Sequence, residues 1–519
     1  MAAVLVIMQF SNLKLTFVLA PIILGLGLLG VWRLKTNAHP KTIRMAFGSP
    51  WKSIHPGLQH TLIGDLTLSN QFEALIGFNQ NGTYVPLAAK EWTISPDYKI
   101  FTFKIDESKK FSDGVKLSAK HFKQAWEDAL KLEPKSSVSS VLDVLYKLEG
   151  FSDFEKNGIL SGVKVIDEAT LELRFATPFR MALEHLSGNR YSAFREVDKK
   201  FVGTGAYVIE EIGPELLKLT PNQYYPTPAK DSIELSMVTA HDSVKALADA
   251  KIDVMAYAIG GAISESLKDH SELSIIVGQD ALHRALYPNA RPGRFFQRKE
   301  MRQALQFLIS KYLKSNPNSL GNPQFTSVDP QVYLPLQKGR LDDEISDRAL
   351  AKGELHVAEL ISAAKKNPPV LIETEEFSLK PILEAVGITI SPKSRVVSKS
   401  ELIALIYSGE EADLIPGSFG VASGDPDGIY HLLGSFGAIT SPMVKNEIVA
   451  SILEAGRKLT DRNEVDPFYQ KVNLAILDQA PIIHLGFNKA VAIYRNDKIR
   501  VEQRTLRRNE GHLHIFEAK

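Results

Sequence analysis

Several stretches of the chain alternate apolar and polar residues with the two-residue period of a half-buried strand. In KIFTFKID (99–106), Phe101, Phe103 and Ile105 fall on one face, and VKVIDEATLELRFATP (163–178) predicts a hairpin. The same pattern predicts strands in TIRMAF (42–47), GTGAYVIEEI (203–212), LLKLTPNQYY (216–225), IELSMV (233–238) and PIIHLGF (481–487).

Other stretches repeat apolar residues every three or four positions, which is typical of amphipathic helices. LSAKHFKQAWEDALKL (117–132) predicts such a helix, with Ser118 as its N-cap, and QRKEMRQALQFLISKY (297–312) predicts another. This mixture of strands and helices in a chain of 519 residues predicts an α/β or α+β protein of roughly two to four domains. Further helices are predicted in LSNQFEALIGF (68–78), SLKPILEAVG (378–387), 443–460 and 466–479, and a strand in ITISP (388–392).

Residues 15–32, LTFVLAPIILGLGLLGVW, carry no charge, and they are preceded by Lys14 and followed by Arg33 and Lys35. A helix needs about 20 apolar residues to cross a bilayer, so this segment is either a membrane anchor or the core of a signal peptide. The small-x-small cleavage site at 36–38 is poor and favours a retained anchor, whereas the two basic residues on the exported side oppose that orientation. Both interpretations place the rest of the chain across the membrane.

Charge and cysteine content exclude several classes of function. The chain has 61 basic and 60 acidic residues, and its formal net charge of +1 gives no general attraction to nucleic acid or to anionic surfaces. Without residues 1–38, which contain three basic residues and no acid, 58 basic and 60 acidic residues leave a net charge of −2. The chain has no cysteine, which excludes disulfides, thiolate metal sites, cysteine nucleophiles and a lipidated N-terminal cysteine.

The sequence offers no recognisable catalytic or cofactor site. P-loop, HExxH and GxSxG motifs are absent, and paired carboxylates such as Glu375 and Glu376 lie in polar surroundings. His512 and His514 alternate in HLHIF and would share one strand face, but no further metal ligands lie near them in the sequence. We therefore expect no metal, no cofactor and no enzymatic activity.

The most informative stretch is FEALIGFNQNGTYVPLAAKEWTISPDYKIFTFKIDESKKFSDGVKLSAKHFKQAW (72–126). It resembles the family 5 extracellular solute-binding proteins, the oligopeptide- and dipeptide-binding receptors of ABC importers. Later segments agree with it, including GTGAY (203–207), MRQALQFLI (301–309), DPDGIYHLLGSFG (425–437) and LDQAPIIHLGF (477–487), so the resemblance covers roughly 42–500. The residues of the first stretch that match the family pattern are Gly82, Pro86, Leu87, Ala88, Trp92, Ser95, Asp97, Phe101, Phe103, Phe111, Asp113, Gly114 and Ala119.

The resemblance implies an α/β fold with two lobes, the periplasmic-binding-protein fold of the large type, with an extra sub-domain and the N-terminal hydrophobic helix. Residues 1–38 are expected to be the signal peptide or anchor. Lobe II is expected over 285–487, and the sub-domain, 73–199, is expected to pack on lobe I. Lobe I is expected to comprise 39–72, 200–284 and 488–519.

The resemblance also implies where a ligand lies, because peptides in this family bind between the lobes largely through main-chain hydrogen bonds. One segment that should line the cleft follows the IHP turn, and the other is GSFGVASGDPDG (417–428). The hinge strands are expected near 282–286 and 482–487. The predicted hinge residues are Ala285, Leu286, Leu485 and Gly486. The predicted ligand-binding residues are His60, Thr61, Leu62, Phe419, Gly420, Val421, Ala422, Ser423 and Asp425.

One position departs from the family pattern. Peptide-binding relatives carry an Asp that pairs with the α-amine of the ligand three residues before the first Asp of the DPD motif, where this chain has Ala422. A buried ammonium without a partner is strongly unfavourable. Asp425 or Asp427 could take this role, although both are expected to cap the following helix. Phe419 is equally suited to the pocket wall and to the core.

We therefore expect a periplasmic receptor that binds a peptide or peptide-like solute and delivers it to an ABC permease in the inner membrane. The receptor is expected to be a monomer, either soluble after signal cleavage or tethered by residues 15–32, and to bind no nucleic acid. One alternative is a receptor for a non-peptide solute such as an oligosaccharide, a nickel chelate or an opine. Another is a membrane-tethered sensor.

Overall fold

In the computed structural model of the protein, the helices and strands described below belong to one unit, residues 43–519, apart from Thr42 at the start of the first strand. The apolar segment 15–32 lies outside the described residues, and each helix within the described ranges is too short or too polar to span a bilayer. The structure describes residues 41–48, 54–58, 62–78, 83–132, 144–213, 216–239, 242–259, 266–335, 337–375, 377–408, 411–420, 425–435, 441–501 and 513–519.

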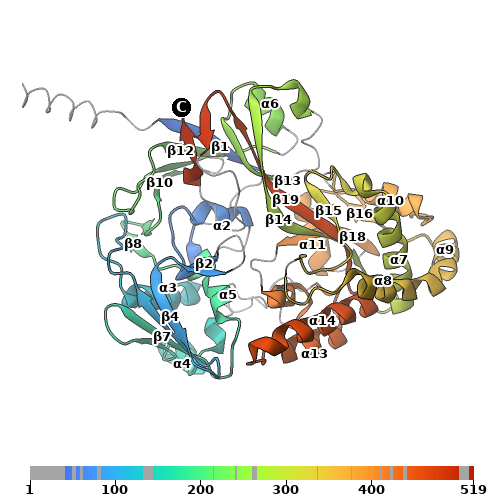
Figure 1. Ribbon diagram of the computed structural model, residues 1–519, viewed down its shortest axis with the longest axis horizontal. Coiled ribbons are helices and arrows are strands. Elements are labelled where there is room, and N and C mark those ends of the chain that lie inside the picture. The colour runs from blue at the N-terminus through green and yellow to red at the C-terminus, as the bar shows by residue number, and fades with distance from the viewer. Residues whose placement is uncertain are drawn as a thin grey trace, which may run out of the picture. The chain divides into compact units, whose positions relative to one another are not determined.

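A mixed sheet of nine strands runs through the compact unit (Figure 1). Strands β1 and β13 are parallel, whereas β13, β19, β14 and β18 are successively antiparallel. A further strand, β15 (Thr326–Val328), pairs with β19. The order of the other strands is β10 (Tyr207–Ile212), β11 (Leu216–Pro221), β12 (Ser232–Met237), β1 (Thr42–Phe47), β13 (Val254–Ile259), β19 (Ile483–Arg495), β14 (Leu273–Pro288) and β18 (Leu414–Gly420).

Strands β14 and β19 are long enough to belong to both halves of this sheet. Residues 273–277 of β14 pair with 491–495 of β19, and residues 282–286 pair with 483–488. The register shifts twice between these two paired regions, around Asp280. Two adjacent strands with an irregular middle therefore connect the lobe I half of the sheet to the lobe II half.

The extra sub-domain is built on a four-stranded sheet and shares its hydrophobic core with lobe I. The sheet has the order β4 (Ala89–Ile94), β5 (Ile100–Ile105), β7 (Thr170–Arg174) and β6 (Val163–Val165), and it packs against α3 (Ala119–Leu132). Phe101, Phe103 and Ile105 of β5 are fully buried, as the alternating pattern predicted. They lie in one cluster with Leu217 and Ile233 of the main sheet, so a single core holds the two parts together.

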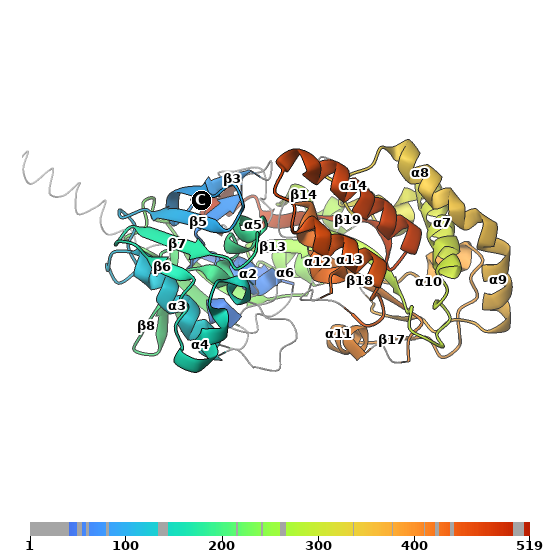
Figure 2. The same cartoon turned by 90° about the horizontal axis from the view of Figure 1, so that it is seen from below.

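In lobe II, helices cover both faces of the sheet. Leu286 packs in a cluster with α7 (Lys299–Ser315), α9 (Val357–Lys366) and α10 (Lys380–Ala385). The next residue towards the N-terminus, Ala285, packs on the opposite face with α12 (Tyr430–Leu433), α13 (Glu447–Gly456) and α14 (Arg462–Gln479). Figure 2 shows α13 and α14 side by side on that face. This alternation is the period of two expected of a strand buried on both faces.

The remaining elements are short. The helices are α2 (Leu62–Leu68), α4 (Phe151–Asn157), α5 (Ala182–Leu186), α6 (Ser243–Ala248), α8 (Asp343–Ala351) and α11 (Lys399–Ser408). The strands are β2 (Ile76–Phe78), β3 (Tyr84–Pro86), β8 (Arg195–Val197), β9 (Lys200–Val202), β16 (Ile372–Glu373), β17 (Arg395–Val396), β20 (Ile499–Val501) and β21 (Phe516–Ala518). The 3-10 helices are η2 (Pro56–Leu58), η3 (Leu145–Lys147), η4 (Asn189–Tyr191), η5 (Ser266–Asp269), η6 (Pro317–Leu320), η7 (Lys352–His356), η8 (Pro426–Ile429) and η9 (Leu513–Ile515).

Three predicted elements are wrong. The helix expected over 68–78 is absent, because α2 ends at Leu68 and the Gln71 side chain that follows accepts a hydrogen bond from Ile209 N at 3.2 Å. The strand expected over 388–392 is absent, because Ile388 N donates to Leu383 O at 2.9 Å and closes the end of α10. In HLHIF, residues 513–515 form a 3-10 helix, and Leu513 N donates to the Asn70 side chain at 3.1 Å.

Candidate ligand-binding site

The first predicted cleft segment lies almost wholly outside the described residues. His60 and Thr61 belong to this undescribed part, and Leu62 is the first residue of α2. In the second segment, Val421, Ala422 and Ser423 also lie outside the described residues. Their roles in ligand binding stay predictions.

Phe419 and Gly420 form the end of β18, which leads into the second segment. The Phe419 side chain is buried and its ring stacks on the His283 ring, with 4.3 Å between the centroids. It belongs to the lobe II core cluster. Gly420 is exposed and lies opposite Leu282 of β14. Of this pair, Gly420 is therefore the exposed residue, and a role of either in ligand binding stays a prediction.

Asp425 caps η8, as the sequence predicted. One carboxylate oxygen accepts a hydrogen bond from Asp427 N at 3.0 Å. The other oxygen accepts from Arg180 Nη1 at 2.7 Å. The carboxylate is thus held on both sides, by the backbone of its own turn and by a guanidinium from the sub-domain.

Asp427 was also expected to cap a helix, and this prediction is wrong. Its carboxylate is buried and accepts hydrogen bonds from Arg457 Nε at 2.8 Å and from the Tyr469 hydroxyl at 2.7 Å. The Arg457 guanidinium lies over the Tyr430 ring, 3.4 Å from its centroid. Leaving a buried carboxylate without charged or hydroxyl partners costs more free energy than leaving the start of a helix without a second cap.

Arg180 connects the sub-domain to lobe II. It precedes α5, and besides Asp425 it reaches the Tyr469 hydroxyl of α14 at 3.4 Å. Burial by itself lowers the pKa of Arg180, but Asp425 and Tyr469 more than offset this and raise its pKa above the ordinary value. No local sequence pattern indicates this contact, because Arg180 and Asp425 are 245 positions apart in the chain.

Two ring contacts accompany the ion pair. The Arg457 guanidinium lies 5.7 Å from the centroid of the Phe179 ring, and the His185 ring lies 5.2 Å from the His431 ring. Phe179 and His185 belong to the sub-domain segment that carries Arg180, whereas their partners belong to lobe II. The sub-domain and lobe II therefore meet through an ion pair flanked by aromatic contacts.

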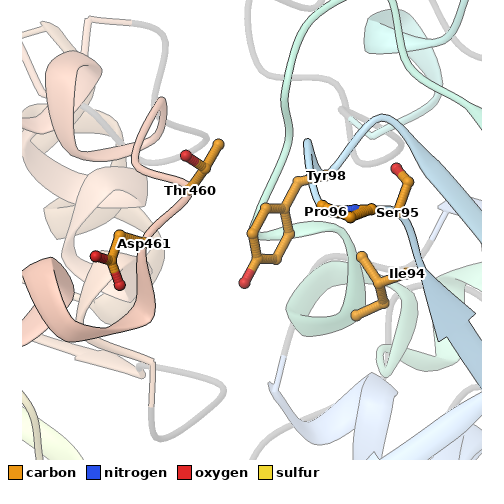
Figure 3. Close-up of a pocket in the computed structure, with 6 residues that line it drawn as sticks. All are labelled: Ile94, Ser95, Pro96, Tyr98, Thr460 and Asp461. Carbon is orange, nitrogen blue, oxygen red and sulfur yellow. The ribbon is translucent and has the colours of Figure 1, made fainter.

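Next to this contact lies a cleft of about 360 Å³. Ile94, Ser95, Pro96 and Tyr98 of the sub-domain form one wall, and Thr460 and Asp461, between α13 and α14, form the other. Figure 3 shows the Tyr98 ring reaching from its wall towards the lobe II side. Tyr98 O also accepts a hydrogen bond from Phe179 N at 2.9 Å, which places the cleft directly beside the Arg180 ion pair.

The four predicted hinge residues lie within the lobe II half of β14 and β19. Ala285, Leu286 and Leu485 are buried in the two lobe II clusters. Gly486 has a φ of +153°, and a Cβ built there would lie 1.9 Å from Ser327 O. The irregular pairing near Asp280 lies closer to lobe I than any of these four residues.

The described residues contain no group of three or more His, Asp or Glu side chains placed to hold a metal ion. His512 lies outside the described residues. Instead of forming a metal site, His283 and His484 share a buried contact, with 3.1 Å between Nδ1 and Nε2. Burial lowers the pKa of His484 to about 3.

Comparison with known sequences gives matches to one family. A model described as bacterial extracellular solute-binding proteins, family 5 Middle, matches residues 83–361, more than half of the chain. The dipeptide-binding protein DppE of Bacillus subtilis (strain 168) is 26% identical over 294 residues, which cover 51% of this chain and 53% of the relative. The periplasmic murein peptide-binding protein MppA of Escherichia coli (strain K12) is 27% identical over 180 residues, covering 31% and 33%. The chain thus matches about half, or less, of the length of these relatives.

Solved structures match over nearly the whole chain. The periplasmic binding protein DppA of Helicobacter pylori, in complex with the peptide STSA, has a TM-score of 0.74 at 17% identity, covering 93% of this chain and 99% of that one. AgaA of A. tumefaciens R10, in complex with agropinic acid, has a TM-score of 0.71 at 17% identity, covering 92% and 98%. The two-lobed α/β fold expected from the sequence is thereby confirmed.

Proposed function

This chain belongs to the bacterial extracellular solute-binding proteins, family 5, and on that premise we propose that it captures a peptide or peptide-like solute between its lobes. The family is one of solute receptors rather than of enzymes. The captured solute would be delivered to an ABC permease in the inner membrane. The relatives named for dipeptide, oligopeptide and murein peptide binding support a peptide as the solute class.

The observation that carries this proposal is the second contact between the lobes. They are joined by the continuous strands β14 and β19, and they meet again where Arg180 pairs with Asp425. A solute held between the strands and this ion pair would be enclosed by both lobes. A ligand that contacts both lobes favours the closed arrangement because it binds that arrangement better than the open one.

The hinge of this motion is proposed to lie where the strands are irregular. Between Val277 and Leu282 the pairing of β14 with β19 shifts register twice. A bulged segment twists and bends more easily than a regular ladder. A third register shift lies between Arg284 and Ala285, so the residues predicted as the hinge, Ala285, Leu286, Leu485 and Gly486, lie at the other end of the same irregular stretch.

The contacts of Asp425 and Asp427 limit which groups of the protein can pair with an amine of the ligand. Ala422 offers no carboxylate to a ligand amine, and the two nearby acids are engaged by Arg180 and Arg457. A peptide amine would therefore be paired elsewhere or be left near solvent. The relatives matched in sequence are named for peptide binding, which favours a peptide over a non-peptide solute, whereas the solved neighbour AgaA is in complex with agropinic acid.

The protein is proposed to work as a monomer in the periplasm. The family name places its members outside the cytoplasm. Whether residues 15–32 are cleaved as a signal or retained as a tether is a separate question. Expression of the full chain followed by N-terminal sequencing of the mature protein would answer it.

The proposal is tested by identifying what the protein carries. The full chain would be expressed in a Gram-negative host, purified from the envelope fraction without denaturant, and denatured in acid, and the released small molecules would be identified by mass spectrometry. We expect a mixture of short peptides. A single sugar, opine or metal chelate as the released species would contradict the proposal.

A further inference from the structure

The Tyr469 hydroxyl has a hydrogen-bond partner on each side of the contact between the sub-domain and lobe II. Tyr469 is fully buried in α14, and its hydroxyl oxygen lies 2.7 Å from Asp427 Oδ1 and 3.4 Å from Arg180 Nη2. Asp427 belongs to lobe II, as Tyr469 does, whereas Arg180 belongs to the sub-domain. The hydroxyl therefore connects a hydrogen bond within lobe II to one that crosses the interface.

The chemistry of the three groups fixes the direction of both hydrogen bonds. A carboxylate can only accept hydrogen bonds, so the Tyr469 hydroxyl donates its proton to Asp427. Burial and the Asp427 carboxylate raise the pKa of Tyr469 far above its ordinary value, so this proton stays on the hydroxyl. Because the hydroxyl has no second proton, its oxygen can only accept a hydrogen bond from Arg180, whose guanidinium can only donate.

Asp427 is itself held in place within lobe II. Arg457 Nε donates to its carboxylate at 2.8 Å, and the Arg457 guanidinium lies over the Tyr430 ring at 3.4 Å. Asp427 and Arg457 are 1% and 6% exposed. These contacts join lobe II residues only, so lobe II can orient the Tyr469 hydroxyl before Arg180 reaches it.

Close packing also fixes the position of the Tyr469 side chain. A Cβ built at Gly456, the last residue of α13, would lie 2.9 Å from the Tyr469 hydroxyl oxygen. A Cβ built at Gly339 would lie 2.7 Å from Tyr469 Cβ. The two glycines leave only the space that the tyrosine fills, so the hydroxyl is held by packing as well as by Asp427.

Arg180 needs the acceptor that Tyr469 presents. Its side chain is 8% exposed, and Nε is buried without a hydrogen-bond partner among the described residues. Nη1 donates to Asp425 Oδ2, and Nη2 donates to the Tyr469 hydroxyl. A buried guanidinium is costly unless its donors find acceptors. Asp425 thus supplies an acceptor for one end of the guanidinium, and Tyr469 supplies one for the other end.

We propose that Tyr469 is a positioning residue for closure of the lobes, with a hydroxyl that Asp427 orients to accept a hydrogen bond from Arg180. This inference rests on the proposed function and adds a residue that sets the affinity without touching the solute. An acceptor that is already oriented loses little conformational entropy when the lobes close. The buried Asp427 carboxylate, which caps no helix, acts on closure through Tyr469.

The test is a double-mutant cycle, measured by calorimetric titration with one peptide. The proteins are the wild type, Tyr469→Phe, Arg180→Met and the double variant. Tyr469→Phe should weaken binding about fivefold in the wild-type background. It should cause no further loss in Arg180→Met, because the hydroxyl has then lost its donor. A merely structural role would give the same loss in both backgrounds.

Tyr333→Phe is the matched control. Tyr333 is 1% exposed and lies beside Tyr469 in lobe II, with 6.4 Å between the ring centroids. Its hydroxyl is buried without a hydrogen-bond partner among the described residues. The substitution therefore removes a buried tyrosine hydroxyl that Arg180 does not use, and it should leave the affinity unchanged.

The closed fraction can be measured independently of the affinity. The chain has no cysteine, so dyes can be attached to Lys164→Cys in β6 and Lys365→Cys in α9, both at exposed positions. Single-molecule energy transfer between the dyes then gives the closed fraction at a fixed peptide concentration. Tyr469→Phe should lower this fraction, but not in the Arg180→Met background.

Three results would overturn the inference. They are wild-type affinity in Tyr469→Phe, an equal loss in the two backgrounds, and a loss in Tyr333→Phe as large as in Tyr469→Phe. If the wild type binds no peptide, the proposed function fails, and energy transfer in the ligand-free proteins decides the inference separately. A closed fraction that Tyr469→Phe lowers only when Arg180 is present would support it, and a fraction that it leaves unchanged would contradict it.

Discussion

Replacing Arg180 with methionine should weaken ligand binding about 30-fold, because this side chain holds the sub-domain to lobe II. Arg180 Nη1 lies 2.7 Å from Asp425 Oδ2. Methionine keeps most of the apolar length of the arginine side chain and removes the charge. Asp425 then remains in the contact without its cation whenever the lobes are closed.

The magnitude follows from the burial of the pair. The side chains of Arg180 and Asp425 are 8% and 18% exposed. Removing one partner of a fully buried ion pair costs about 3 to 5 kcal/mol. The residual exposure of Asp425 and its hydrogen bond from Asp427 N reduce this to about 2 kcal/mol. When the lobes are apart, water solvates Asp425. The free-energy cost of the unpaired carboxylate therefore destabilises only the closed state, and it lowers the affinity of any ligand that binds the closed state.

The assay is calorimetric titration of the wild type, Arg180→Met and the double variant Arg180→Met/Asp425→Asn with the same peptide. The double variant removes the lone charge and keeps an oxygen for the cap, so it should bind within about threefold of the wild type. Lys314→Met breaks an exposed ion pair with Asp347, whose side chains are 71% and 53% exposed, and should have no measurable effect. Wild-type affinity in Arg180→Met, or a double variant weaker than the single one, would refute the reasoning.

Two further substitutions test the buried part of β19. Burial lowers the pKa of His484 to about 3 in the folded protein, below its value of about 6.5 in the unfolded chain. The contribution of His484 to the free energy of unfolding should therefore be constant above about pH 6.5. Between about pH 6.5 and about pH 3 it should fall as the pH decreases, by up to about 1.4 kcal/mol per pH unit. Urea titrations at several pH values should show a shallower fall for His484→Gln, and an unchanged slope would contradict the assignment. Gly486→Ala should lower the melting temperature by several degrees or prevent folding, because its Cβ would meet Ser327 O at 1.9 Å; a variant as stable as the wild type in calorimetry would show that this backbone approach is not needed.

The sequence predicted the elements whose own residues determine them. The stripe of Phe122, Ala125, Trp126 and Ala129 buries one face of α3, and that helix begins after Ser118 as expected. Strand β5 and the hairpin of β6 and β7 also follow their local pattern. In these segments the periodicity of apolar residues and the tertiary burial agree.

The errors arose where distant residues decide the local conformation. The chain near Asn70 and Gln71 cannot continue α2, because Gly203 and Gly205 approach its backbone so closely that a Cβ on either would meet a carbonyl oxygen within 2.5 Å. No local pattern reveals this contact across about 130 positions. The same limit applies to the site, because Arg180 does not stand out from other arginines until the fold brings Asp425 next to it.

Closure of the two lobes over a peptide can be followed directly by small-angle X-ray scattering. The protein would be freed of bound solute by unfolding and refolding, and its radius of gyration measured before and after saturation with a peptide that binds in calorimetry. We predict a smaller radius of gyration in the presence of the peptide, and a smaller change in Arg180→Met at the same peptide concentration. A peptide that binds tightly without any change in the radius of gyration would contradict capture by closure of the lobes.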